Sequence, residues 1–408
     1  MDQIDAQLKL YKAAIEIELQ RLLKWWKSNT IDELQGGFYG EVGNDNLPFA
    51  EQPKGLVLNS RILWTFSAAF LHGQQQDDLE IAKRAFDYLS AHFYDAENGG
   101  FYWSLKANGE VRDGKKQIYG QAFAIYGLTE YYKATSDEKA LDLAKETFAL
   151  LEKHSFDSAH LGYVEAFDQG WQTLADLRLS DKDLNAEKSM NTHLHIIEAY
   201  ANLYQVWKDE RVANALKNLL FIFRKHIITE SYHLSLFFSL DWTPQSAVVS
   251  FGHDIEAAWL LQECAESLGD QEEMDAFKSI ALQITAAVLK GIDQDGGMYY
   301  EYDPATDHLV REKHWWPQAE AMVGFFNAYQ LTGNRDYLMN SMNSWSFVQT
   351  ALKDNKNGEW FWGIYPDGTL MEENKAGFWK CPYHNGRACL EILSRLTKSN
   401  DFVSRDSS

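Results

Sequence analysis

The sequence is poor in cysteine, in proline and in positive charge, and each shortage excludes a class of protein. Three cysteines in 408 residues are too few for a framework of disulfide bonds, and none belongs to a CxxC pair. With 7 prolines and 14% aromatic residues, the chain is not intrinsically disordered, because disordered chains are poor in aromatics. The 38 basic and 59 acidic residues give a formal net charge of −21. We therefore expect no nucleic-acid partner and no anionic membrane surface, since both bind clustered lysine and arginine.

Long apolar runs are also missing. No stretch of 18 consecutive apolar residues occurs, so we expect no membrane-spanning helix. The stretch 1–26 carries a charge every few residues and has neither an apolar core nor a cleavage motif, which argues against a signal peptide. The expectation is a cytoplasmic protein in a reducing compartment. The 45% of hydrophobic residues are enough for a large core.

A short cluster of glycine followed by aromatic residues recurs along the chain. Five clear copies begin about 63 residues apart, or two such periods apart in one case, at positions 36, 99, 162, 296 and 358. The double interval contains a degenerate copy at 232–238. The chain therefore contains six copies of one unit.

The stretches between these clusters have helical periodicity. Leu194, Ile197, Ala201 and Tyr204 form one apolar stripe, and the same pattern occurs at 56–70, 122–132, 255–268 and 319–331. Each unit is thus predicted to be a helix, a short aromatic hairpin and a second helix.

Six helix pairs can build an open solenoid or a closed ring. Solenoids usually have shorter periods and polar capping repeats, which this chain lacks. We therefore predict an all-α fold, an (α/α)6 barrel of six helical-hairpin repeats with short β-hairpins on one face. Residues 1–397 form one domain in this prediction, and residues 398–408 form a polar C-terminal tail.

One candidate pair lies at 251–256, where a predicted helix begins. His253 and Glu256 are three residues apart, so both occupy one face of that helix at its N-terminal end. A carboxylate beside an imidazole fixes its tautomer and raises its pKa, which suits an acid/base catalyst. The alternative is a first turn whose acidic residues only complement the helix dipole.

The densest cluster of polar and aromatic side chains is the stretch 379–387. Pro382 precedes a predicted helix that runs to Leu396, so His384 and Arg387 fall near its first turn. In a helical barrel such positions lie at the mouth. A histidine, an arginine and a tryptophan at one helix start exceed what a core requires, and they favour a functional site.

Two further histidines, His193 and His195, lie two residues apart in another predicted helix. Residues with that spacing point about 200° apart, so only one of the two can face the barrel interior. This argues against a metal site formed by the pair. Periodicity alone does not decide which histidine faces inward.

Arg61 and the group Trp315, Trp316 and Glu320 lie near the starts of two more apolar helices. A positive charge there opposes the helix dipole, so Arg61 is either a partly exposed side chain with a packed stem or a donor to an oxyanion. Paired tryptophans are more often core than ligand platform, although a sugar site requires flat aromatic faces.

Searches for cofactor and nucleophile motifs find nothing. The sequence contains no HExxH, GxGxxG or GxSxG. The stretch 109–116 mimics a phosphate-binding loop, but Lys116 stands where serine or threonine is required, and the stretch falls in a predicted hairpin.

Seven stretches, in order along the chain and covering all six units, carry a family resemblance: 60–67, 121–126, 165–168, 190–200, 252–257, 315–321 and 379–387. By these motifs the chain resembles the N-acylglucosamine 2-epimerase superfamily, and within it most closely the cellobiose 2-epimerases. It departs from the pattern at Gly120, where many such epimerases have asparagine in a Tyr-Asn-Gln motif.

The resemblance implies an (α/α)6 barrel that inverts C2 of the reducing-end sugar in β-1,4-linked disaccharides such as cellobiose, lactose and mannobiose. It implies no metal, nucleotide or nicotinamide, and a monomer or homodimer. It also assigns roles to ten residues: an acid/base pair (His253, His384), a supporting histidine (His195), a ligand of the C1 and C2 oxygens (Arg61), tuning carboxylates (Glu256, Glu320) and sugar contacts (Tyr119, Asn191, Trp316, Trp379).

The residue types fit such a reaction. The C2 hydrogen is acidic only beside the carbonyl of the open-chain sugar, and histidine can both take and return that proton near neutral pH. Two bases on opposite faces, or one base and a rotating intermediate, both account for inversion.

Three other functions remain open from the sequence. A mannose isomerase or an N-acylglucosamine 2-epimerase shares the enediolate intermediate. A glycoside hydrolase could use Asp254, Glu256 and Glu320 as its carboxylates, although three histidines at one mouth argue against it. A non-catalytic sugar-binding protein would show no turnover.

Overall fold

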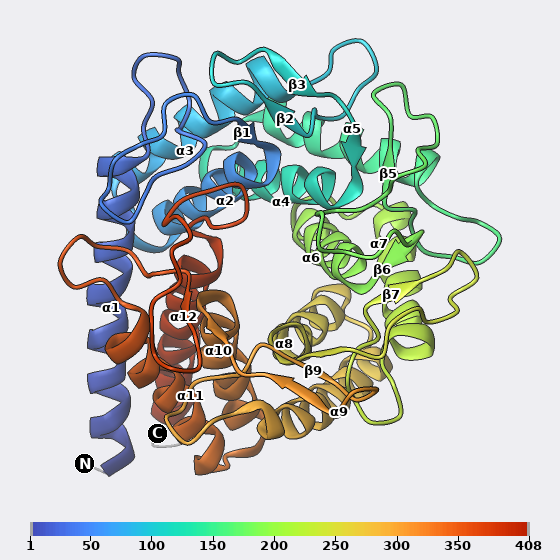
Figure 1. Cartoon of the computed structure of the whole chain (residues 1–408). Helices are drawn as coiled ribbons and strands as arrows, with labels where there is room; N and C mark the ends of the chain where they lie inside the picture. Colours follow the sequence, from blue (N-terminus) through green and yellow to red (C-terminus); the bar gives the residue numbers. More distant parts are fainter. Residues whose placement is uncertain (1–2, 406–408) are drawn as a thin grey trace.

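Two concentric rings of helices make up the molecule (Figure 1). The computed structural model describes residues 3–405, and the side chains of residues 4–397. Within residues 3–405 the inner helices are α2 (Leu56–Gly73), α4 (Ile118–Thr135), α6 (Met190–Val206), α8 (Phe251–Leu268), α10 (Trp315–Thr332) and α12 (Tyr383–Arg405). The outer helices are α1 (Gln3–Asn29), α3 (Gln76–Tyr88), α5 (Glu138–His154), α7 (Glu210–Ile222), α9 (Gln271–Val288) and α11 (Arg335–Phe347).

The inner ring is closed. Each inner helix packs against the next one along the chain, and α12 packs against α2. The N-terminal helix α1 lies beside the C-terminal helix α12, so both ends of the chain contribute to the same unit (Figure 1). The predicted (α/α)6 barrel is therefore confirmed. Helix α12 reaches Arg405, well into the stretch 398–408 that we predicted as a tail, and residues 406–408 lie outside the described range.

Inner and outer helices differ in composition because they differ in burial. In α4 every residue from Ile118 to Thr129 is buried, since neighbours cover it on all sides, and its sequence is apolar almost throughout. The single apolar stripe predicted on α6 understates this burial, which extends from Thr192 to Leu203 without a break. Outer helices bury one face only, and four of them begin with an Asp or Asn cap that accepts a backbone N–H: Asp137, Asp209, Asp270 and Asn334.

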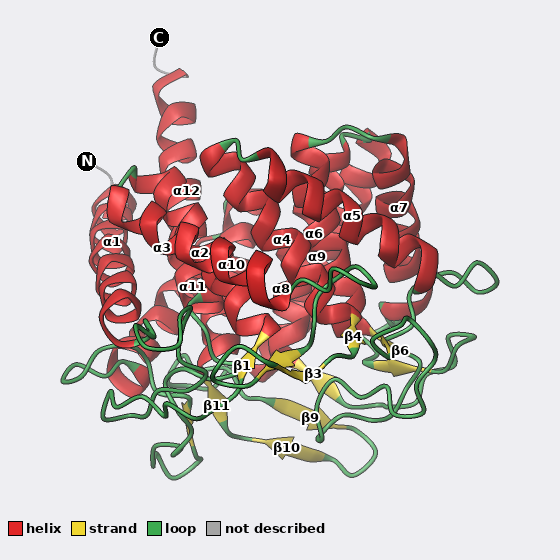
Figure 2. Ribbon diagram, turned by 90° about the horizontal axis from the view of Figure 1, so that it is seen from above, coloured by secondary structure: helices red, strands yellow, loops and turns green. Residues whose placement is uncertain are grey.

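Short strands and long loops gather at one end of the barrel, opposite the chain termini (Figure 2). The strands are β1 (Lys54–Gly55), β2 (Ser104–Leu105), β3 (Val111–Asp113), β4 (Lys116–Gln117), β5 (Ala166–Phe167), β6 (Lys188–Ser189), β7 (Phe237–Phe238), β8 (Val249–Ser250), β9 (Glu301–Asp303), β10 (His308–Val310), β11 (Lys313–His314) and β12 (Gly363–Ile364). Strands that precede an inner helix pair antiparallel with a strand of the following unit, as β4 does with β5 and β6 with β7. These pairings join neighbouring units and fix where each inner helix begins.

An ion pair between a buried lysine and an aspartate recurs beneath this end of the barrel: Lys54 with Asp32, Lys116 with Asp95, Lys188 with Asp157, Lys313 with Asp293, and Lys375 with Asp354. Each pair ties the turn after an outer helix to the segment before the next inner helix. Lys116, which gave the false phosphate-loop pattern, belongs to this set. The degenerate fourth unit has Thr229 and Val249 at the matching positions.

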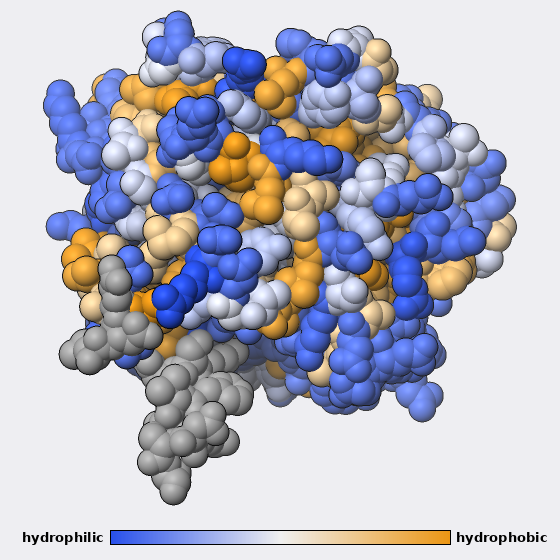
Figure 3. Space-filling model, turned by 90° about the horizontal axis from the view of Figure 1, so that it is seen from below, coloured by the Kyte–Doolittle hydropathy of each residue, from blue (hydrophilic) through white to orange (hydrophobic). Residues whose placement is uncertain are grey.

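One face of the molecule is shown in space-filling form in Figure 3. The face shown in Figure 3 is mostly hydrophilic, and its apolar side chains form small separated patches. Across the described residues, none of the helices combines the length and the low polarity that a bilayer crossing requires.

Candidate active site

A cavity of ≈ 470 Å³ opens at the loop end of the barrel, where the inner helices begin. Nine of the ten residues singled out from the sequence line it: Arg61, Tyr119, Asn191, His195, His253, Glu256, Trp316, Trp379 and His384. The tenth, Glu320, lies directly behind His384. All ten belong to the first two turns of an inner helix or to the loop before one, so the repeat brings them together from all six inner helices.

His384 is held by a carboxylate. Its Nδ1 donates to Oε1 of Glu320 at 2.7 Å. Glu320 also accepts from Arg387 and from the indole N–H of Trp259, so its oxygens act as acceptors and the proton of His384 lies on Nδ1. Burial, Arg61 and Arg387 lower the pKa of His384 well below its usual value. His384 is therefore a neutral imidazole whose Nε2 is left for a ligand.

His253 has a different support. Its Nδ1 lies 2.8 Å from the hydroxyl of Ser250, and its ring contacts Trp316. Burial and the neighbouring His195 lower its pKa to about 3. We expected Glu256, one turn along, to fix the tautomer of His253 and raise its pKa, and this expectation is wrong. Glu256 bonds across the barrel to Arg387 instead, at 2.6 Å.

The structure decides between the two histidines of α6. His195 lines the cavity, and its Nδ1 lies 2.9 Å from Glu198. His193 points into the wall, where its Nε2 accepts from the backbone N–H of Tyr163 and its Nδ1 lies 2.7 Å from the carbonyl of Ser189. His193 is thus a buried structural residue, and His195 is the one available to a ligand.

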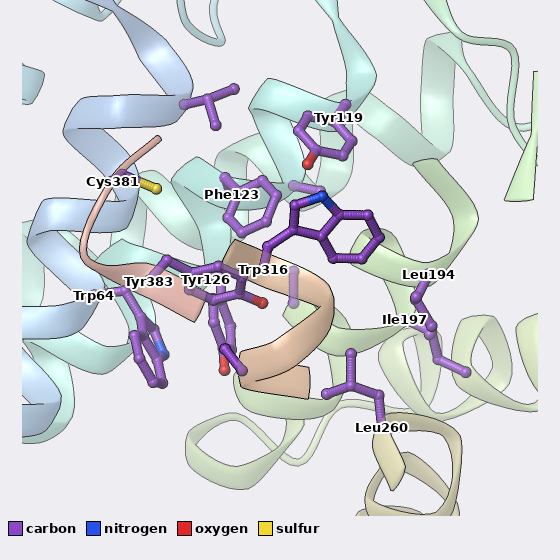
Figure 4. Close-up of a cluster of buried hydrophobic side chains, with 14 of the residues drawn as sticks. Trp64, Tyr119, Phe123, Tyr126, Leu194, Ile197, Leu260, Trp316, Cys381 and Tyr383 are labelled. Atoms are coloured by element: carbon purple, nitrogen blue, oxygen red, sulfur yellow. The ribbon is translucent and has the colours of Figure 1, made fainter. Parts of the chain in front are cut away.

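Arg61 is a buried cation with no carboxylate beside it among the described residues. It is 2% exposed and donates to the hydroxyl of Tyr119 at 2.7 Å. Its guanidinium also lies against the rings of Phe123 and Tyr383. Figure 4 shows these rings grouped together beside Trp316. The interpretation as a partly exposed side chain is wrong. A buried, uncompensated positive charge at a cavity wall favours a ligand that develops negative charge.

The aromatic side chains of the cavity form a lining on two sides. The ring of Trp316 contacts those of both His253 and His384. Trp379 is backed by Phe378 and Trp103. The side-chain oxygen of Asn191 is buried without a partner in the described part of the chain, and it is free to bond to a hydroxyl group.

Comparison with known proteins identifies the family of the chain. Residues 37–388 match the family described as N-acylglucosamine 2-epimerase (GlcNAc 2-epimerase). The chain belongs to this family. It is 47% identical to the cellobiose 2-epimerase of Bacteroides fragilis over 388 residues, which cover 94% of this chain and 99% of that protein. It is 36% identical to the cellobiose 2-epimerase of Dictyoglomus turgidum, with coverages of 95% and 100%.

Solved structures give the same result. The structure of cellobiose 2-epimerase from Spirochaeta thermophila DSM 6192 superposes with a TM-score of 0.92 at 40% identity, and covers 98% of this chain and 99% of that one. The D-mannose isomerase of Marinomonas mediterranea is a more distant relative, at 23% identity.

The structure also contains a charge cluster around Arg387 that the sequence did not reveal. Arg387 donates to three buried carboxylates, Glu198, Glu256 and Glu320, at 2.5–2.7 Å. Burial and the charge of Glu320 raise the pKa of Glu256 to about 7. The sequence alone places Arg387 in a dense polar and aromatic cluster but does not identify its carboxylate partners. The ion pairs of Arg387 with these carboxylates connect α12 to α6, α8 and α10, and residue spacing within one helix cannot reveal contacts between helices.

Three of these groups have the arrangement of metal ligands. One donor atom each from Glu256, Glu320 and His384 lies within 4.8 Å of the others. Within the described residues, however, Nη2 of Arg387 donates to Oε1 of both carboxylates, so a protein cation already engages them.

A second cavity, of ≈ 820 Å³, lies beside the fourth unit and contains none of the predicted residues. It opens where that unit lacks the lysine–aspartate pair. Asp254 faces this side, because it accepts from His233 and from the backbone N–H of Leu234. Asp254 is therefore not a carboxylate of the catalytic cavity.

Proposed function

We propose that the protein inverts the configuration at C2 of the reducing-end sugar of β-1,4-linked disaccharides, as the name of its cellobiose 2-epimerase relatives implies. The observation that carries the proposal is the meeting of His195, His253 and His384 with the uncompensated Arg61 in one aromatic cavity. Cellobiose, lactose and mannobiose are the proposed substrates.

The reaction begins with the open-chain aldehyde, because only an adjacent carbonyl makes the C2 hydrogen acidic. A cavity histidine takes the proton of the C1 hydroxyl on its Nε2 and gives it to the ring oxygen as the bond between C1 and that oxygen breaks, so the ring opens and the histidine is again neutral. The neutral imidazoles of His253 and His384 are then able to accept the C2 proton. Arg61 stabilises the resulting enediolate, whose charge forms next to a guanidinium shielded from water.

Inversion requires that the proton returns to the opposite face of C2. The rings of His253 and His384 both contact Trp316, so they are proposed as the pair that takes and returns it. Direct transfer by two bases and rotation of the intermediate over one base both fit this arrangement.

Hydrolysis of the glycosidic bond fits less well. Glycosidases need one carboxyl group to protonate the leaving oxygen and a second to act on the opposite face of the sugar. Glu256 and Glu320 are instead bonded to the same guanidinium nitrogen of Arg387, and Glu320 also holds His384 and Trp259. Neither carboxylate is available for such work.

The test is incubation with cellobiose, lactose, mannobiose, mannose and N-acetylmannosamine, followed by NMR of the products. The expected product of cellobiose is glucosyl-mannose with its glycosidic bond intact. Release of free glucose from cellobiose would contradict the proposal and indicate a hydrolase. Turnover of mannose to fructose without any disaccharide product would indicate an isomerase. The chain is proposed to act as a monomer or homodimer, which light scattering measures.

A further inference from the structure

The three cavity histidines are supported by three different groups at Nδ1. His384 has Glu320, His253 has the hydroxyl of Ser250, and His195 has Glu198 one turn along the same helix. The supports of His384 and of His195 are carboxylates. Both carboxylates also bond to Arg387.

Glu198 accepts hydrogen bonds from three side chains. His195 Nδ1 lies 2.9 Å from its Oε2, the hydroxyl of Tyr383 lies within 2.7 Å of both its oxygens, and Arg387 donates to Oε1 at 2.5 Å. Its side chain is 4% exposed. Burial raises the pKa of Glu198, but Arg387 and the bond from His195 outweigh this effect and bring it to about 2. Glu198 is therefore an anion whose partners are all donors.

An anionic acceptor at Nδ1 determines which nitrogen of His195 carries the proton. With Nδ1–H directed at Glu198, the lone pair of His195 lies on Nε2. Nε2 has no protein partner within the described part of the chain, and the side chain lines the cavity. His193, two residues earlier, shows the contrast: a neutral carbonyl holds its Nδ1, and a backbone N–H occupies its Nε2.

We propose that Glu198 is a positioning residue for the reaction. Its carboxylate fixes His195 with Nε2 toward the substrate, and through Arg387 it couples that histidine to the carboxylates around His384. This inference rests on the proposed function, since it assigns His195 a role in the same cavity.

The groups that face His195 are few and come from four inner helices: Glu198 on α6, Tyr119 and Phe123 on α4, His253 and Glu256 on α8, and Tyr383, His384 and Arg387 on α12. Glu198 is the carboxylate in direct contact. Its loss therefore removes the acceptor that fixes the Nδ1–H tautomer of His195.

The substitution Glu198→Gln keeps the shape and removes the charge. The amide of glutamine offers one acceptor and one donor, whereas His195, Tyr383 and Arg387 all donate to this position. His195 therefore loses its fixed orientation. We expect kcat on cellobiose to fall by roughly ten- to a hundred-fold, while KM changes less than about threefold. The fall in kcat with a nearly unchanged KM, together with loss of the Nδ1–H tautomer of His195, is a readout that a merely structural role would not move.

The matched control is Glu152→Gln. Glu152 is another largely buried carboxylate, and it accepts from the hydroxyls of Tyr163 and Tyr200 with no histidine beside it. We expect this variant to keep the kcat of the native protein and the Nδ1–H tautomer of His195. In Glu198→Asp, the retained charge should keep the Nδ1–H tautomer of His195 while kcat falls, because the carboxylate is withdrawn by one methylene.

A measurement on the unmodified protein keeps the inference testable even if Glu198→Gln does not fold. In ¹⁵N NMR of the histidine-labelled protein, the signal of His195, assigned by its loss in His195→Asn, should report Nδ1–H and an unprotonated Nε2. The opposite tautomer would overturn the inference, as would a Glu198→Gln enzyme with native kcat and the Nδ1–H tautomer of His195. The tautomer is measured without turnover, so it fails or succeeds independently of the proposed epimerase activity.

Discussion

Two buried arginines at the cavity should respond in opposite ways to replacement by methionine. Arg387 compensates three carboxylates, whereas Arg61 has none within the described residues and contacts a phenol hydroxyl and three aromatic rings. The comparison separates a charge that stabilises the fold from a charge reserved for the reaction.

The magnitudes follow from these contacts. In Arg61→Met the lost hydrogen bond to Tyr119 and the three cation–π contacts are worth about 1–2 kcal/mol each. Their loss is offset because an unpaired buried charge, which costs several kcal/mol to desolvate, is removed. We therefore expect an unchanged or slightly higher free energy of unfolding. In Arg387→Met, three carboxylates lose their cation, and we expect a loss of about 3–5 kcal/mol.

The effect of Arg61→Met on activity should differ from its effect on stability. If Arg61 stabilises the enediolate, Arg61→Met should lower kcat on cellobiose by about 10²- to 10³-fold, or about 2.7–4 kcal/mol of transition-state stabilisation. The assay combines urea unfolding, followed by far-UV circular dichroism, with initial rates at saturating cellobiose. The reasoning is refuted if Arg61→Met destabilises the protein as much as Arg387→Met does, or if it retains kcat within tenfold of the native value.

Three further predictions concern packing, the repeat and acid stability. An added Cβ at Gly120 would lie 3.0 Å from the indole of Trp103, which packs behind Trp379. Gly120→Ala should therefore raise KM for cellobiose several-fold with little change in kcat. An unchanged KM would contradict this prediction. Lys116→Met should lower the free energy of unfolding by about 3–5 kcal/mol, because it leaves Asp95 buried without its partner. The double variant Lys116→Val/Asp95→Thr places the residues of the fourth unit at these positions, and it should recover much of that loss in urea titrations. Burial lowers the pKa of His193 to about 3, so on acidification the unfolded chain binds a proton there before the folded chain does. The free energy of unfolding should therefore fall as the pH drops from about 6.5 to about 3. His193→Gln should flatten the slope of unfolding free energy against pH in that window, and an unaltered slope would refute the assignment.

The fold was predictable because one unit recurs six times. Glycine–aromatic clusters at a regular interval indicate repeats, and each repeat places the start of an inner helix at the same end of the barrel. The placement of Arg61, His253 and His384 near the starts of inner helices follows from the regular spacing of the repeats. Their convergence in one cavity needs no knowledge of individual contacts.

The partners of these residues were not predictable, because they come from other units. Local spacing pairs His253 with Glu256, yet Glu256 bonds to Arg387 from a helix more than a hundred residues away, and Ser250 holds His253. The orientation of His195 depends in the same way on how α6 is rotated against its neighbours. Side-chain periodicity is too coarse to fix that rotation in a helix that is buried on all sides.

The most direct test of the account is deuterium incorporation at C2 of cellobiose in D₂O, measured by NMR for the native protein and for His253→Ala and His384→Ala. The account predicts that the native protein exchanges the C2 hydrogen and leaves the glycosidic bond intact, and that both variants fold but exchange nothing. Absence of C2 deuterium with the native protein, or a variant that exchanges at close to the native rate, would contradict it.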